Sequence, residues 1–140
     1  MTEVKVTKTI NAPAAPVWAK IAAFSGIEDF SPIERSVVEG DGEGAKRTCY
    51  MPDGAEINET LLKLDNDAME LEYDIVSGPF PFTNYIGKVK VASKGNNSSE
   101  VSWGSTFEEQ EGTKAAMEEL LGGFYHTMID QLETLASVEA

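Results

Sequence analysis

The sequence predicts an α+β domain in which a seven-stranded antiparallel curved sheet wraps around one long C-terminal helix. Seven segments show the polar and apolar alternation of half-buried strands, and the last stretch, Thr113 to Val138, carries apolar residues at helical spacing. A helix of about 25 residues is roughly 37 Å long, which is enough to cross a small domain. Its apolar stripe needs a surface to cover, and the sheet provides one.

The N-terminal part of the chain supplies one strand and two short helices. Residues Thr2 to Ile10 alternate as a first strand. Helical spacing follows from Ala14 to Phe24, and a second short helical turn is expected from Gly26 to Phe30. These two short helices between strands 1 and 2 would close one end of the sheet.

Six further segments alternate as strands, at residues 33–39, 45–51, 55–65, 68–77, 83–93 and 99–109. Their connections are short and rich in turn residues, so consecutive strands should pair antiparallel. Alternation of direction then places the loops at 52–54, 78–82 and 109–112 at one end. One of these loops contains alternating proline and phenylalanine residues, Pro79-Phe80-Pro81-Phe82, which suits the opening of an apolar pocket.

The terminal helix carries an apolar stripe that recurs every three or four residues. Its members are Met117, Leu120, Leu121, Phe124, Met128, Leu132 and Leu135. The pair Gly122-Gly123 interrupts this stripe and should cost about 2 kcal/mol relative to two alanines. We therefore expect packing, ligand binding or motion to explain the glycines.

Composition limits the function classes. At 140 residues the chain suits a single domain spanning 1–140, and its 24 acidic and 11 basic residues give a net charge of −13. This charge argues against nucleic-acid partners, and no apolar run is long enough for stable membrane insertion. Cys49 and His126 are single residues of their kind, so neither a disulfide nor a zinc site is expected. We expect a cytoplasmic monomer or weak homodimer without a metal or cofactor.

The two-residue period of strands points several polar side chains into the interior. Tyr73 and Tyr85 lie in phase with apolar neighbours, and so does Trp103. Arg47 and Glu59 also point inward, from adjacent strands. Because two inward charges are costly unless they pair, we expect these two side chains to form an ion pair.

This ion pair has two interpretations. It could simply brace the sheet, or it could form the polar end of an apolar pocket, where Arg47 binds a carbonyl or acid group and Glu59 moves a proton. The candidate catalytic residues are Arg47, Glu59, Tyr73 and Tyr85. The candidate ligand-binding residues are Phe30, Ile57, Leu71, Phe80, Phe82, Trp103, Phe107, Leu121, Phe124 and Met128.

Several segments resemble one protein family in their order and spacing. They are APAAPVW, PIERSVVEGDGEGAKR, INETLLKLD, ELEYDI, FTNYIGKVKV and VSWGSTFEE, followed by the terminal helix. The chain resembles the polyketide cyclase/dehydrase and lipid-transfer branch (START-like, SRPBCC) of the Bet v 1-like superfamily. Phe30 departs from the tryptophan that many relatives carry there.

The resemblance implies the helix-grip fold and a pocket between the sheet and the C-terminal helix. We expect the pocket to bind or carry a small hydrophobic or aromatic molecule that bears a carbonyl group. A second hypothesis is a cofactor-independent cyclase, dehydratase or isomerase, because the Arg47 and Glu59 pair resembles that of lachrymatory-factor-synthase-like members. A third is a co-chaperone-like protein-interaction module, which would need a filled core in place of a pocket.

Overall fold

The computed structural model describes the backbone of residues 1–139 and the side chains of residues 1–137, so Ala140 of the predicted domain lies outside the described residues. The elements are β1 (Thr2–Ile10), α1 (Ala14–Ala22), the 3-10 turn η1 (Ile27–Phe30), β2 (Arg35–Glu39), β3 (Lys46–Tyr50), β4 (Glu56–Asp65), β5 (Glu70–Ser77), β6 (Phe82–Gly95), β7 (Ser98–Glu109) and α2 (Lys114–Glu139). The predicted order of strands and helices, with two short helices between β1 and β2, is confirmed.

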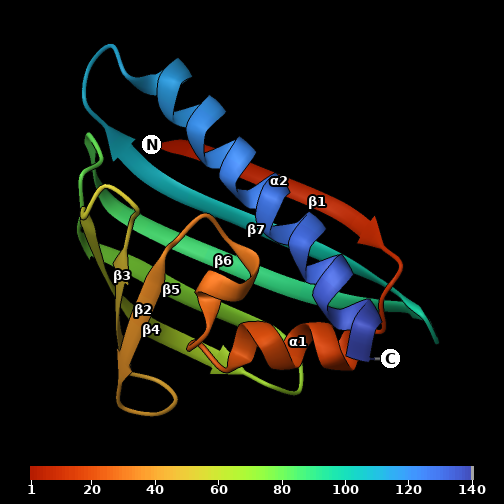
Figure 1. Ribbon diagram of the computed structural model, residues 1–140. Coiled ribbons are helices and arrows are strands. Elements are labelled where there is room, and N and C mark those ends of the chain that lie inside the picture. Colours follow the sequence, from red (N-terminus) through yellow and green to blue (C-terminus); the bar gives the residue numbers. More distant parts are fainter. Residues whose placement is uncertain (140) are drawn as a thin grey trace.

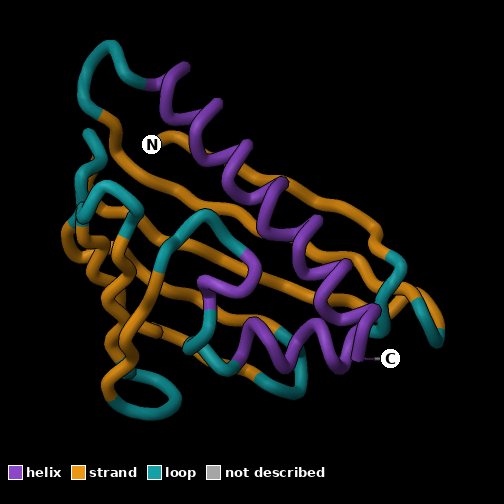
Figure 2. The backbone as a smooth tube through the Cα atoms, in the orientation of Figure 1, coloured by secondary structure: helices purple, strands orange, loops and turns teal. Residues whose placement is uncertain are grey.

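The strands form one antiparallel sheet in the order β1-β7-β6-β5-β4-β3-β2. The chain therefore runs as a meander from β2 to β7, and β1 closes the far edge by pairing with β7. The sheet curves around α2, which follows β1 and β7, while α1 packs near the C-terminal end of α2 (Figures 1 and 2). This arrangement is the predicted helix-grip architecture.

Helix α1 and strand β5 are shorter than predicted because a residue at one end of each has a left-handed backbone conformation. Helix α1 ends at Ala22 instead of Phe24, which adopts a left-handed conformation with φ of 62°. Strand β5 begins at Glu70 instead of Ala68, after Met69 with φ of 54°. Phe24 is nevertheless 3% exposed, so burial of its side chain in the core stabilises this uncommon backbone conformation.

Helix α2 buries one face against the sheet. Its buried residues are Met117, Leu121, Tyr125, Met128, Ile129, Leu132 and Ala136. Leu120, which the sequence placed in this stripe, is 45% exposed, and His126 is exposed as well. A Cβ atom at Gly122 would lie 4.0 Å from Val4, and one at Gly123 would meet no atom within 4 Å. Packing therefore does not explain the two glycines.

The C-terminal half of α2 is tied to the end of β1. Lys8 forms an ion pair with Asp130, and the backbone N–H of Asn11 donates to Glu133 Oε2 at 2.6 Å. The hydroxyl of Ser137 donates to the Asn11 carbonyl at 2.9 Å. These contacts fix the second half of the helix on the sheet. Neither described helix is long and apolar enough to cross a lipid bilayer.

Candidate functional site

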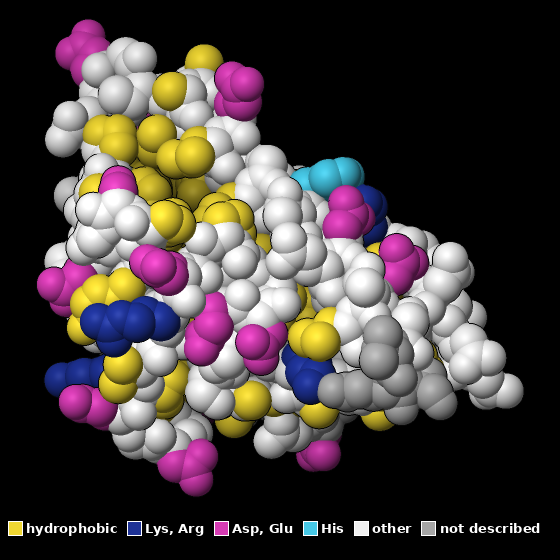
Figure 3. Space-filling model, viewed as in Figure 1, with side chains coloured by type: hydrophobic (Ala, Val, Ile, Leu, Met, Phe, Trp, Pro, Cys, Tyr) yellow, Lys and Arg dark blue, Asp and Glu magenta, His cyan; other side chains and the backbone are white. Residues whose placement is uncertain are grey.

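A cavity of about 90 Å³ lies between the sheet and the N-terminal half of α2. Its lining residues are Ile27, Ile33, Met51, Ile57, Glu59, Tyr73, Ile75, Phe80, Tyr85, Leu120, Leu121, Phe124, Tyr125 and Met128. Because Leu120 is 45% exposed, the cavity reaches the surface beside this residue. Figure 3 shows hydrophobic side chains gathered in a hollow at this end of the molecule. Met51 directly precedes one of the loops that were predicted to surround the opening, and Phe80 belongs to another.

The first polar group at the cavity is the Arg47–Glu59 pair. The two residues are directly opposite each other on β3 and β4, and Arg47 Nε lies 2.6 Å from Glu59 Oε1. Arg47 also donates to the Phe24 carbonyl at 3.0 Å. Burial is the largest single influence and disfavours the charged guanidinium, but the charge and hydrogen bond of Glu59, together with Cys49 and Tyr73, raise the pKa of Arg47 overall. The expected ion pair is present, and its two side chains are almost wholly buried.

Two neighbours complete the surroundings of this pair. The Cys49 thiol donates to Glu59 Oε1 at 3.3 Å, and the guanidinium of Arg47 lies 3.9 Å from the centre of the Phe24 ring. Burial, followed by the Glu59 carboxylate, raises the pKa of Cys49 well above its ordinary value. Cys49 is therefore a neutral thiol and a poor nucleophile.

The second polar group is a row of hydroxyls that we call the tyrosine chain: Tyr73, Tyr85 and Tyr125, with Trp103 at one end and Ser105 at the other. Trp103 Nε1 donates to the Tyr73 hydroxyl at 3.0 Å, and that hydroxyl lies 3.0 Å from the Tyr85 hydroxyl. The Tyr85 hydroxyl bonds to that of Tyr125, which donates to Ser105 Oγ at 2.8 Å. The chain thus links β5, β6, β7 and α2.

The tyrosine chain is neutral. Burial raises the pKa of Tyr73 and Tyr85 well above the usual value of 10.0, and burial also raises the pKa of Tyr125 to about 12. Gly87 makes room for one member, since it sits opposite Tyr73 in the sheet and a Cβ atom there would be 2.3 Å from Tyr73 Cζ. Within the described residues, every buried polar side-chain atom has a hydrogen-bond partner.

The structure brings together some of the predicted site residues and separates others. Those that line the cavity are Glu59, Tyr73, Tyr85, Ile57, Phe80, Leu121, Phe124 and Met128. Those that do not are Arg47, Phe30, Leu71, Phe82, Trp103 and Phe107. Arg47 instead borders a void of about 10 Å³ beneath α1, together with Phe30, Leu71 and Trp103. Arg47 therefore contacts Glu59 from the side that faces away from the cavity.

The predicted aromatic residues that do not line the cavity fill the core beside it. Phe82 stacks on Tyr85 with ring centres 5.2 Å apart and packs at a tilt against Phe107 with ring centres 5.1 Å apart. Phe30 packs edge-on against Trp103 at 6.5 Å. Trp103 points inward as predicted, but inward in this fold means either core or cavity.

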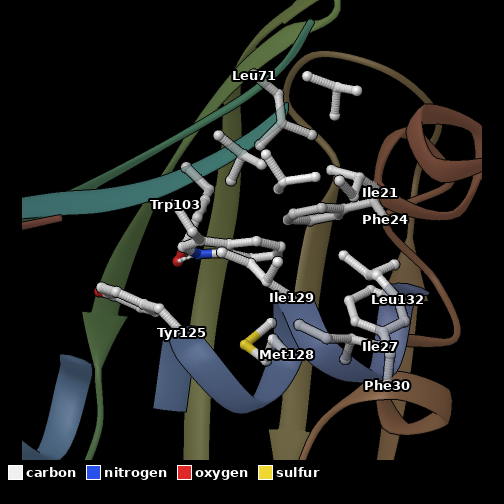
Figure 4. Close-up of a cluster of buried hydrophobic side chains, with 14 of the residues drawn as sticks. Ile21, Phe24, Ile27, Phe30, Leu71, Trp103, Tyr125, Met128, Ile129 and Leu132 are labelled. Carbon is white, nitrogen blue, oxygen red and sulfur yellow. Dashed lines mark hydrogen bonds between the residues drawn. The ribbon is translucent and has the colours of Figure 1, made fainter. Parts of the chain in front are cut away.

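The most important residue that sequence reasoning missed is Tyr125. Its ring stacks beside the ring of Trp103 with centres 6.4 Å apart. Figure 4 shows Tyr125 on α2 together with Met128 and Ile129. The spacing Leu121, Tyr125, Met128 was a usable signal, because it is the i, i+4, i+7 pattern of a buried helix face. Among the described side chains, no three histidine, cysteine, aspartate or glutamate residues are grouped as metal ligands.

Residues 1–137 match the family described as polyketide cyclase / dehydrase and lipid transport. The chain belongs to this family. The predicted resemblance is therefore confirmed over nearly the whole sequence. No curated protein matches the chain.

Solved structures agree with the family assignment. The protein XoxI from Bacillus cereus is 27% identical, with a TM-score of 0.89 over 100% of this chain and 99% of that one. An aromatase/cyclase from Streptomyces sp. R1128 is 15% identical, with a TM-score of 0.84 over 97% and 93% of the two chains. Norcoclaurine synthase from Thalictrum flavum is 18% identical, with a TM-score of 0.80 over 99% and 95%. The last two likenesses establish the shared fold.

Proposed function

We propose that this protein binds and carries a small apolar molecule in the cavity between the sheet and α2. The observation that supports the proposal is the lining of the cavity, where ten apolar residues surround Glu59 and the three tyrosines. Such a lining, mostly apolar with a few convergent polar groups, is typical of small-molecule sites. The family includes lipid transport in its description, which agrees with carriage.

The size of the cavity limits the ligand. An engineered apolar cavity of about 150 Å³ binds benzene, and the cavity here is about 90 Å³. A single ring therefore fits only when side chains at the opening move aside. Leu120 is suited to such movement because it is 45% exposed. We retain the hydrophobic or aromatic ligand that the sequence predicted. We do not retain its carbonyl group, because Arg47 was expected to bind that group and does not line the cavity.

A cofactor-independent cyclase, dehydratase or isomerase is the second candidate. The Glu59 carboxylate is 7% exposed and lines the cavity, so it could accept a proton from a bound molecule. The aromatase/cyclase neighbour shows that the same fold can house such chemistry. A co-chaperone-like module would need a filled core, and the cavity argues against it.

Native mass spectrometry of freshly purified protein tests carriage. We expect a retained apolar molecule that is released chemically unchanged after incubation. Chemical conversion that is lost in Glu59→Gln would favour the enzyme, and protein that neither retains nor takes up any apolar molecule would contradict both.

The location of the site can be tested with a matched pair of variants and toluene, a neutral single-ring probe whose binding is measured by isothermal titration calorimetry. Leu120→Trp should block the opening and weaken toluene binding about tenfold. Leu62→Trp is the control, because Leu62 is 43% exposed but does not line the cavity. Equal toluene binding by the two variants would place the ligand elsewhere.

A further inference from the structure

We infer that the cavity selects an apolar ligand that carries a hydrogen-bond donor, such as a hydroxyl or ammonium group, over one that carries only acceptors. The inference deepens the proposed function and rests on it. It follows from the direction of the hydrogen bonds around the four polar residues that line the cavity.

The direction of the tyrosine chain is fixed at both ends. Trp103 Nε1 can only donate, so the Tyr73 oxygen accepts from it. At the other end the Tyr125 hydroxyl donates to Ser105 Oγ. The hydrogen of Tyr125 is thereby used, so the bond between Tyr85 and Tyr125 requires Tyr85 to donate.

The same reasoning extends back along the chain. Once Tyr85 has given its hydrogen to Tyr125, the bond between Tyr73 and Tyr85 requires Tyr73 to donate. Every tyrosine hydroxyl then donates once and accepts once within the chain. Each oxygen retains one lone pair, and a ligand can meet only an acceptor at these three positions.

Glu59 presents acceptors as well. As the ion-pair partner of Arg47 it is a carboxylate, and its Oε1 already accepts from Arg47 and Cys49. Arg47, the nearest strong donor, is not among the described residues that line the cavity. The polar side chains of the cavity thus offer acceptors without a free donor.

The negative charge around the opening also selects against ligands that carry an anionic acceptor. Segments 33–35, 51–56, 74–82 and 108–120 lie at this end of the molecule and contain the acidic residues Glu34, Asp53, Glu56, Asp74, Glu108, Glu109, Glu111, Glu118 and Glu119. The basic residues in these segments are Arg35 and Lys114. This field opposes the approach of a carboxylate and favours a neutral or cationic ligand.

Four probes with the same tolyl body test the inference by isothermal titration calorimetry on the full chain at pH 7: 4-methylphenol, 4-methylbenzylamine, 4-methylacetophenone and 4-methylbenzoate. The phenol and the ammonium form of the amine can donate, whereas the ketone and the carboxylate can only accept. We expect the two donors to bind about tenfold more tightly than the ketone, with benzoate weakest.

A ketone or benzoate that binds as tightly as the donor probes would overturn the inference and leave the proposed function intact. Failure of all four probes to bind, together with no binding of toluene, would overturn both.

Tyr125→Phe tests the role of the tyrosine chain. Without an acceptor at position 125, the Tyr85 hydrogen is free to point into the cavity, so the affinity for 4-methylacetophenone should rise about tenfold. Ser105→Ala frees the Tyr125 hydrogen instead and offers a second route if the first variant does not fold. Tyr50→Phe is the control, because Tyr50 packs under Arg35 outside the chain. Unchanged ketone affinity in both folded chain variants would overturn the assigned bond directions.

Discussion

The Arg47–Glu59 pair and the tyrosine chain are both buried polar groups beside one cavity, but only the pair is charged. The pair joins two adjacent strands, whereas the tyrosine chain joins three strands and α2. Removing one partner of the pair leaves a charge without compensation. Removing one hydroxyl of the chain redirects a neutral hydrogen bond. The pair should therefore matter most for stability and the chain for what the cavity accepts.

The largest expected effect comes from breaking the charged pair. Arg47→Ala should lower the free energy of unfolding by about 3–5 kcal/mol, because Glu59 remains buried without its partner. Urea denaturation followed by circular dichroism measures the change.

The double variant Arg47→Met, Glu59→Leu is the control for burial of charge. It should recover at least half of the loss, since no charge is left uncompensated. A single variant within about 1 kcal/mol of wild type would show that the pair does not brace the sheet.

A smaller effect is expected in the tyrosine chain. Tyr125→Phe should cost about 1 kcal/mol at pH 8, the typical value of one neutral hydrogen bond. The cost should then change with pH, because burial raises the pKa of Tyr125 from 10.0 to about 12.

The sign of this pH dependence follows from the raised pKa. The folded state holds the neutral phenol more tightly than the unfolded state does, so its contribution is complete below pH 10 and is lost as the pH rises toward 12. The stability difference between wild type and Tyr125→Phe should shrink across this interval in urea denaturation. A difference that stays constant from pH 8 to pH 11.5 would contradict the assignment.

The smallest effect is expected where charge is present without burial. Lys8 and Asp130 pair at the surface, with side chains 28% and 48% exposed. Lys8→Met should lower the free energy of unfolding by about 0.5 kcal/mol, and this loss should fade in 1 M salt. A loss as large as that of Arg47→Ala would mean that burial is not what distinguishes the two ion pairs.

The sequence was sufficient for the fold and for the charged pair. Seven alternating segments and one long helical stripe determine the architecture, and the two-residue period fixes which strand residues point inward. Arg47 and Glu59 follow from that period together with the antiparallel order of their strands. Both inferences use local spacing, which a single chain displays directly.

The boundary between core and cavity could not be predicted in the same way. Trp103 and Phe107 point inward as Tyr73 and Tyr85 do, yet only the two tyrosines reach the cavity. Which inward residues meet empty space depends on the curvature of the sheet and on how far α2 stands above it. Tyr125 lies on α2. The strand pattern contains no information about how this helix is rotated relative to the sheet, so it could not place Tyr125 beside the cavity.

Gly87 limits which substitutions this site can tolerate during evolution. Because the Tyr73 ring occupies the space where a side chain at position 87 would begin, the two positions cannot change independently. A relative with a larger residue at the position of Gly87 should also have lost the tyrosine that faces it, and with it the link between Trp103 and Tyr85. Paired substitution at these two positions would therefore mark lineages that have rebuilt the pocket for a different ligand.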